Sequence, residues 1–139
     1  MGMISFLQYI IDNLLGFINR YKNGCCRTEL IRAYYDRLLG LGFEVHQGYD
    51  LTEDELFKQG RGDCQDRSLA LARYMIRIGC TGVQLLYMKS IDPDEAGHVA
   101  VLHDGYVYDP TMDYWHYPDW NYKSLMKSYK DFYEVPVTW

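Results

Sequence analysis

Cys64 is the residue in this chain best suited to nucleophilic chemistry, because of its place in the sequence pattern. It follows a glycine-flanked turn at residues 60–63 and opens the segment CQDRSLALARYMIRIG, whose apolar residues recur at helical spacing. A thiol is a nucleophile only as a thiolate, which the positive end of a helix dipole and a neighbouring imidazolium both stabilise. We therefore predict that Cys64 is a nucleophile rather than a small buried apolar residue, and that a histidine lies near it.

A predicted hairpin supplies both the histidine and a carboxylate. The strand-like runs HVAVLH and YVYD are separated only by an Asp-Gly dipeptide, a strong signal for a two-residue hairpin turn. In that register His103 faces Tyr106, which makes His98 and Asp109 diagonal neighbours on one face of the hairpin. A shift of one residue would move Asp109 to the other face, so the prediction depends on the length of the turn. We expect His98 to hydrogen-bond Asp109, although Asp-Pro-Thr is also an ordinary start of a turn, and His103 to point away from them.

A cysteine, a histidine and a carboxylate together can catalyse acyl transfer. A Cys64 thiolate would attack a carboxamide or peptide carbonyl and form a thioester, while His98 protonates the leaving amine. His98 would then activate water, giving hydrolysis, or an acceptor amine, giving transfer, and Asp109 would orient its ring. For the oxyanion, the backbone N–H of Cys64 is the natural first donor. The Gln59 side chain is a candidate second donor, with a solvated Gln at a helix end as the alternative reading.

The order of these segments resembles the transglutaminase-like branch of the papain-like Cys-His-Asp thiol enzymes, in which a GxC turn opens a helix and a His strand and an Asp strand follow. The matching pieces are GDCQDRSLALARYMIRIG and GHVAVLHDGYVYDPT, within residues 60–111. The resemblance implies Cys64 as nucleophile, His98 as general base and acid, and Asp109 as the residue that orients His98. Papain-like enzymes carry an oxyanion Gln six residues before the cysteine, whereas Gln59 lies five residues before Cys64.

Members of this family differ in what they do. They include amide-crosslinking enzymes, peptidases and isopeptidases, deglycosylating amidases, and domains that have lost catalysis and bind partners. The RGDC stretch is also similar to the RGGxC turn of arylamine acetyltransferases, but 139 residues leave little room for their added barrel and lid. We expect a cysteine peptidase or amidase, or a protein-glutamine acyltransferase, that acts on a protein or peptide substrate, with hydrolysis favoured. The alternative is a catalytically silent binding or scaffold domain.

Two acids flank the nucleophile in the sequence. Negative charge next to Cys64 would raise the pKa of a thiol through space. Asp63 and Asp66 are instead expected to cap the helix that Cys64 opens, and to pair with Arg61 or Arg67.

Hydrophobic periodicity predicts helices first and strands afterwards, the order of an α+β protein with N-terminal helices packed on an antiparallel sheet. Thr52 and Glu55 have the spacing of a capping box, and Gly79 is placed to end the helix that starts at Cys64. The aromatic tail is predicted to be a loop up to Tyr122, followed by a short helix and an edge strand that carries Pro136. The predicted helices are 1–24, 28–40, 51–59, 64–79 and 124–133, and the predicted strands are 83–88, 98–103, 106–109 and 134–139.

The N-terminal segment of this single domain, residues 1–24 of 1–139, is predicted to be an amphipathic helix. It carries Gln8 and Asp12 within its apolar run and lacks a basic leader, so it is expected to be neither a signal peptide nor a membrane span. Docking on its own domain is favoured, a homodimer through this helix is the second possibility, and a membrane surface the third, since basic residues occur only at Arg20 and Lys22. The apolar stripe, at alternating spacings of three and four, consists of Ile4, Leu7, Ile11, Leu14 and Ile18.

The amino-acid composition limits which binding partners and which cellular compartment are expected. The net charge is −5 without a basic stripe, so no nucleic acid is expected as a partner. The chain has no CxxC or paired-histidine spacing, and the acidic loop IDPDEAG lacks the spacing of a calcium loop, so no metal and no other cofactor are expected. Cys25 and Cys26 are poorly placed to pair with each other, and these thiols and Cys80 are expected to be free in a reducing, cytoplasmic compartment.

Aromatic residues and the acidic loop bear on the substrate. Many of the fourteen Tyr lie between Tyr106 and Tyr133, as an aromatic core layer or as a groove. Tyr114, Trp115 and Trp120 are candidates to line that groove. The acidic loop before His98 favours basic or neutral substrates over acidic ones.

Overall fold

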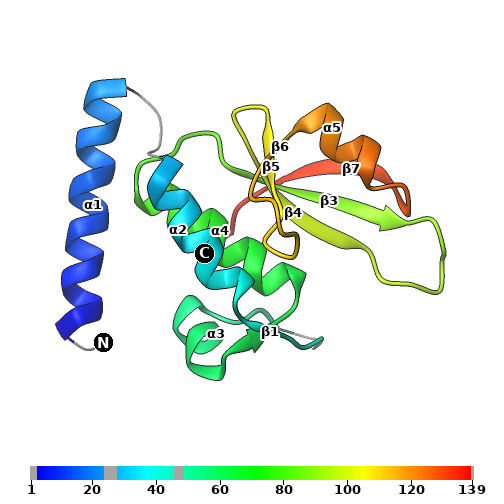
Figure 1. Ribbon diagram of the computed structural model, residues 1–139, viewed down its shortest axis with the longest axis horizontal. Helices are drawn as coiled ribbons and strands as arrows, with labels where there is room; N and C mark the ends of the chain where they lie inside the picture. The colour runs from blue at the N-terminus through cyan, green and yellow to red at the C-terminus, as the bar shows by residue number, and fades with distance from the viewer. Residues whose placement is uncertain (1–2, 24–27, 46–48, 139) are drawn as a thin grey trace.

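The computed structural model describes residues 3–23, 28–45 and 49–138, with side chains of the first helix described over residues 5–15, and its elements follow the predicted order (Figure 1). Cys25 and Cys26 lie outside the described residues. The elements are α1 (Met3–Asn23), α2 (Thr28–Leu39), β1 (Gly42–Phe43), α3 (Glu53–Gln59), β2 (Arg61–Gly62), α4 (Cys64–Arg77), β3 (Gln84–Ser90), β4 (His98–His103), β5 (Tyr106–Tyr108), β6 (Tyr117–Pro118), α5 (Asp119–Leu125) and β7 (Tyr129–Pro136).

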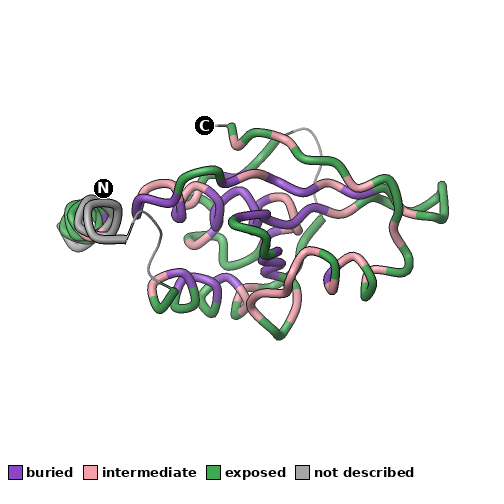
Figure 2. Tube along the Cα trace, turned by 90° about the horizontal axis from the view of Figure 1, so that it is seen from above, coloured by how far each residue is buried: buried purple, intermediate pink, exposed green. Residues whose placement is uncertain are grey.

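The main sheet is antiparallel, with strand order β6-β5-β4-β3-β7, so β4 lies at its centre. Since successive residues of a strand point to opposite faces, each face buries its own cluster. Leu85 and Val101 pack against helices α2 to α4 on one face. Leu86 and Ala100 pack on the other face against Tyr122 of α5. Figure 2 shows the buried segments gathered in the middle of the body, with exposed segments on both sides.

The predicted helix starts are confirmed by their caps. Thr52 and Glu55 form the capping box of α3, and Asp63 and Asp66 form that of α4. In each box a side-chain oxygen accepts a backbone N–H that the helix itself cannot satisfy. The first residue of α4 is therefore Cys64, as the sequence predicts.

The hairpin turn is also confirmed, and with it the register of β4 on β5. Asp104 and Gly105 both have positive φ, 52° and 79°, as the tight primed turns of two-residue hairpins require. His103 pairs with Tyr106 in the ladder, as predicted. This register places residues 98 and 109 on the same face of the sheet.

The prediction for residues 124–133 is wrong. The helix in the tail, α5, comes earlier and begins after Pro118, whose fixed φ is compatible with a helix start. Residues 129–136 form β7, which supplies the backbone hydrogen bonds that one side of β3 needs, and Asp131 has a φ of 53° that no continuous helix would hold. The predicted edge strand with Pro136 is confirmed, although it starts five residues earlier than expected.

Helix α1 lies against α4 with its polar side. Asp12 is 1% exposed, accepts a hydrogen bond from Gln8 at 2.8 Å, and its Oδ2 lies 3.7 Å from the Arg77 Nε. The apolar residues Leu7 and Leu14 are 51% and 57% exposed. The helix docks on its own domain, as expected, but the apolar stripe is not the surface that docks.

The expectation of free thiols is wrong for Cys80, which is disulfide-bonded. Among the described cysteines, Cys64 is the free one. Because disulfides persist in oxidising environments, the argument for a cytoplasmic location loses its basis in the cysteines. In the part of the chain that is described, no helix is long and apolar enough to cross a membrane.

A buried arginine joins the parts of the fold that surround Cys64. Arg67, on the second turn of α4, is 4% exposed, and its guanidinium donates to five backbone carbonyls. These belong to Leu38 and Leu41 at the end of α2, Gly42 of β1, Gly62 before Cys64 and Pro110 after β5, at 2.7–3.4 Å. The predicted pairing of this arginine with Asp63 or Asp66 is replaced by these carbonyl contacts.

We predict that Arg67→Lys lowers the free energy of unfolding by about 3 kcal/mol. The single ammonium of lysine cannot reach all the carbonyls that surround the planar guanidinium. Hydrogen bonds to charged groups contribute about 1.5–3 kcal/mol each. Urea unfolding at constant m value measures the change. The control is Arg73→Lys, because Arg73 is less buried and donates to the single carbonyl of Thr138. Equal effects of the two substitutions would contradict the role assigned to Arg67.

Candidate active site

Cys64 is held at the start of α4 by a closely packed turn. A Cβ on Gly62 would lie 2.5 Å from the end of the Leu56 side chain and 3.0 Å from Asp66 Oδ2, so a larger residue there would require both side chains to move. Asp66 accepts backbone N–H groups from both Asp63 and Leu51, which fixes the turn to the chain before α3. The thiol is half-buried and lies at the end of the helix where the backbone N–H groups are free.

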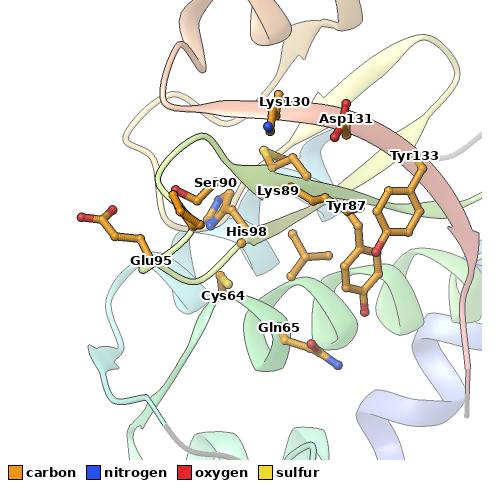
Figure 3. A pocket seen from close by; sticks show the side chains of 14 residues that line it. Cys64, Gln65, Tyr87, Lys89, Ser90, Glu95, His98, Lys130, Asp131 and Tyr133 are labelled. Atoms are coloured by element: carbon orange, nitrogen blue, oxygen red, sulfur yellow. The ribbon is translucent and has the colours of Figure 1, made fainter.

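His98 reaches Cys64 because β4 packs along α4. The Ser68 hydroxyl, one turn after Cys64, donates to the carbonyl of Val99 at 3.0 Å and is fully buried. This bond joins the helix that begins with Cys64 to the strand that begins with His98. Figure 3 shows Cys64 and His98 next to each other at one end of the cleft.

The predicted contact of His98 with Asp109 is present. The His98 Nε2 lies 2.7 Å from Asp109 Oδ2, and the carboxylate side chain is completely buried. Cys64 lies close enough to His98 to contribute to raising the pKa of the imidazole. Because Nε2 is occupied by the carboxylate, Nδ1 is the ring nitrogen left for exchange with a second partner.

The ionisation of this pair follows from its contacts. Burial lowers the pKa of His98, but its hydrogen bonds with Asp109 and Cys64, together with their charges, outweigh burial and raise the pKa to about 10. Burial raises the pKa of Asp109, and the hydrogen bonds and charge of His98 reverse this and lower the pKa below its usual value. The pair is therefore an imidazolium and a carboxylate at neutral pH.

Asp109 has partners that the sequence analysis missed. The Tyr122 hydroxyl of α5 donates to Oδ2 at 2.7 Å, and Thr111 donates to Oδ1 through its backbone N–H at 3.1 Å and its hydroxyl at 2.6 Å. Tyr35 of α2 donates to the backbone carbonyl of Asp109 at 2.7 Å. The Asp-Pro-Thr turn contained the signal for Thr111. In a chain with fourteen Tyr, nothing local distinguishes Tyr122 from the others.

Other predicted residues lie elsewhere. The Gln59 side chain is exposed, donates to the Arg61 carbonyl at 2.9 Å and is not among the residues that line the cleft. Arg61 pairs with Glu44 at 2.9 Å rather than with the acids beside Cys64. The His103 ring is buried on the other face of the sheet, consistent with the prediction that it points away from the site.

The cleft beside Cys64 and His98 has a volume of about 640 Å³. Tyr87 and Tyr133 stack with ring centroids 5.6 Å apart and form its far end, as Figure 3 shows. These two tyrosines occupy the place that the sequence analysis proposed for Tyr114, Trp115 and Trp120, which do not line this cleft. Charged residues of both signs border it: Lys89, Glu95, Lys130 and Asp131.

Comparison with known proteins identifies the fold. No protein-family model matches the chain, and no curated protein matches its sequence. Two solved structures of LapG from Legionella pneumophila, one calcium-bound and one EGTA-treated, align with a TM-score of 0.61 at 13% identity over 78% of this chain. The chain covers 65% and 63% of those two proteins, less than two thirds of their length. The likeness shows that the chain has an α+β fold of the papain-like, transglutaminase-like type, which confirms the predicted fold class.

The calcium of one LapG structure raises the question of a cation here. Within the ranges that the structure describes, no three side chains of the His, Cys, Asp and Glu type gather as a metal site requires. The acids nearest to Cys64, Asp63 and Asp66, are already used as helix caps. The donor set does not fit a metal ion, and we assign none a role in the chemistry.

The His98–Asp109 pair predicts a pH dependence of stability. A histidine whose pKa is raised stabilises the fold fully below its unfolded value of about 6.5, and this contribution is lost as pH rises toward about 10. His98→Gln should therefore lower the free energy of unfolding by about 2 kcal/mol at pH 6 and by progressively less up to pH 10. Urea unfolding at each pH measures this difference.

The control for this experiment is His103→Gln. Burial lowers the pKa of His103, so the wild-type histidine stabilises the fold less as pH falls below about 6.5. The difference in free energy of unfolding between the wild type and His103→Gln should therefore change with pH in the direction opposite to that of His98→Gln. Parallel pH profiles for the two variants would show that His98 does not form the charged pair.

We predict that Tyr122→Phe weakens the support of the Asp109 carboxylate. Loss of a buried hydroxyl donor costs about 1–2 kcal/mol of stability and raises the pKa of Asp109 toward its usual value. A carboxylate with a lowered pKa stabilises the fold above its unfolded pKa and loses this effect as pH falls through the folded pKa. The acid decline in stability of the variant should therefore begin at higher pH.

Urea unfolding from pH 3 to pH 7 measures this shift. Tyr106→Phe, at a more exposed tyrosine on the strand that leads to Asp109, is the control. If the free energy of unfolding of Tyr122→Phe declined over the same acidic pH range as that of the wild type, the hydrogen bond to Asp109 would be contradicted.

Proposed function

We propose that this chain is a transglutaminase-like cysteine enzyme that cleaves an amide or isopeptide bond of a protein or peptide through a thioester. The observation that carries the proposal is the convergence of Cys64, His98 and Asp109 at one end of a cleft. The fold supports it, since the structural neighbours suggest a transglutaminase-like cysteine protease. A cysteine kept free while Cys80 is disulfide-bonded is also suited to a reactive role.

The reaction begins with Cys64 as thiolate and His98 as imidazolium. The sulfur attacks the carbonyl carbon, and the backbone N–H of Cys64 at the start of α4 donates to the oxyanion that forms. The tetrahedral intermediate collapses as the C–N bond breaks, and His98 gives its proton to the leaving amine. The products of this half-reaction are a thioester on Cys64, a free amine and a neutral imidazole.

The second half-reaction returns the enzyme to its starting state. His98 takes a proton from water, the resulting hydroxide adds to the thioester carbonyl, and the C–S bond breaks to release a carboxylic acid. Asp109 stays ionised throughout and holds the ring in position, because its own oxygens are saturated by His98, Thr111 and Tyr122. Hydrolysis is proposed over transfer because the exposed rim residues Lys89, Lys130 and Asp131 leave the thioester accessible to water.

The first test needs no substrate. Iodoacetamide labelling at pH 7, followed by peptide mass spectrometry, should modify Cys64 at least about tenfold faster in the wild type than in His98→Ala, because the imidazolium stabilises the thiolate. The denatured protein, in which Cys64 has no neighbours, gives the reference rate. A wild-type rate equal to that reference would favour the silent binding domain.

The second test measures cleavage. A proteome-derived peptide library incubated with the protein should acquire new termini with the wild type and none with Cys64→Ala. Asp109→Ala should retain more activity than His98→Ala, because Asp109 orients the base and does not itself carry the proton. A labelled primary amine added to the same mixture distinguishes hydrolysis from transfer, since transfer would attach the label to the acyl product. Equal cleavage by all variants would overturn the assignment.

A further inference from the structure

Helix α1 presents an apolar face that its own domain leaves uncovered. Phe6, Leu7, Ile10, Ile11 and Leu14 are each close to half exposed or more. We infer that this face docks on α1 of a second copy of the chain and that the two helices form a parallel two-stranded coiled coil.

The spacing of the apolar residues in the sequence is that of a coiled-coil seam. Isoleucines recur every seven residues at positions 4, 11 and 18, and leucines recur at positions 7 and 14 between them. A β-branched residue at the first position with leucine at the second favours two parallel strands. A stripe of this type is complementary to itself, so an identical chain related by two-fold symmetry is the partner that it fits.

Contacts with the body hold α1 in the rotation that this pairing needs. Gln8 and Asp12 are one turn apart and face α4, where Arg77 lies between Asp12 and Glu53. Arg77 binds both Glu53 oxygens, at 2.9 and 3.2 Å, so its position is fixed from the body. Because successive helix residues are turned by about 100°, a buried Asp12 directs Ile11 and the rest of the stripe away from the domain.

Charge favours a second chain over a lipid surface as the occupant. Helices that lie on membranes carry lysine and arginine along their polar face. The charged residues in the sequence of α1 are Asp12 and, near the end of the helix, Arg20 and Lys22, and the chain as a whole has a net charge of −5. Two basic residues at one end are too few to hold the helix along an anionic surface, whereas a two-stranded coil needs no charge at its core.

Pairing through α1 is compatible with an open cleft. Figure 1 shows α1 at one end of the molecule and the connection between β3 and β4, which borders the cleft, at the other. Residues of this connection that line the cleft are Pro93, Glu95 and Gly97. The inference is independent of the proposed function, because no residue of the seam belongs to the site.

Sedimentation equilibrium of the full chain tests the pairing. From micromolar to hundred-micromolar concentration, the wild type should approach twice the mass of the 16.4 kDa chain. The variant with both Leu7→Glu and Leu14→Glu should dissociate at least about a hundredfold more readily, since two buried leucines are replaced by charges. Asn13→Glu is the matched control on an exposed position outside the seam, and it should remain a dimer.

Orientation is tested by cross-linking. In a parallel coil the two copies of position 7 face each other, so Leu7→Cys should give a disulfide-linked dimer on mild oxidation and Asn13→Cys should not. Absence of the link in Leu7→Cys would overturn the parallel arrangement.

Two results would overturn the pairing itself. One is a wild-type chain that stays monomeric at every concentration, a measurement that does not depend on any variant folding. The other is a monomer that floats with phosphatidylcholine vesicles, with or without phosphatidylserine, and loses this binding in the double variant. The circular dichroism and thermal unfolding of each variant show whether its body is intact.

Discussion

The arrangement of the site depends on one buried guanidinium. Arg67 donates to carbonyls before Cys64, at the end of α2, and after the strand that leads to Asp109. A cation sequestered from water is costly unless its donors are satisfied, and here the backbone satisfies them in place of a carboxylate. Segments far apart in the sequence therefore bind one planar guanidinium. Each segment must adopt its native path for every N–H group of that guanidinium to have an acceptor.

The buried charged groups of the site are also fully hydrogen-bonded. Asp109 is fully buried, yet both its oxygens accept hydrogen bonds, from His98, Tyr122 and Thr111. The imidazolium and the carboxylate compensate each other, so the fold prefers the charged pair near neutral pH. In the proposed mechanism the reaction begins from this same state, so catalysis would not oppose stability at this pair, in contrast to sites that store strain.

Features determined by short stretches of chain were predictable from the sequence, and those determined at a distance were not. Capping residues mark the starts of α3 and α4, and the Asp-Gly turn determines which residues of β4 face β5, so the meeting of His98 with Asp109 followed from local rules. The tail was mispredicted because its aromatic residues suit a helix or a strand equally, and the free side of β3 decides between them. The support from Tyr122, the carbonyl contacts of Arg67 and the polar docking of α1 each join residues that no local pattern relates.

The two ends of strand β4 differ in the sequence changes that they can accept. At the Asp104–Gly105 end, one inserted or deleted residue would invert the face on which Asp109 lies, so insertions and deletions there would remove the carboxylate from the histidine. At the other end, the connection over residues 91–97 lies outside the paired strands, and three of its residues border the cleft. A change of length there would leave the faces of β4 unaltered, whereas Gly97 is restricted in identity, because a Cβ would lie 2.5 Å from the Met88 carbonyl oxygen. The two connections of β4 are therefore under different geometric constraints: the length of one determines whether residues 98 and 109 share a face, and the length of the other affects only the border of the cleft.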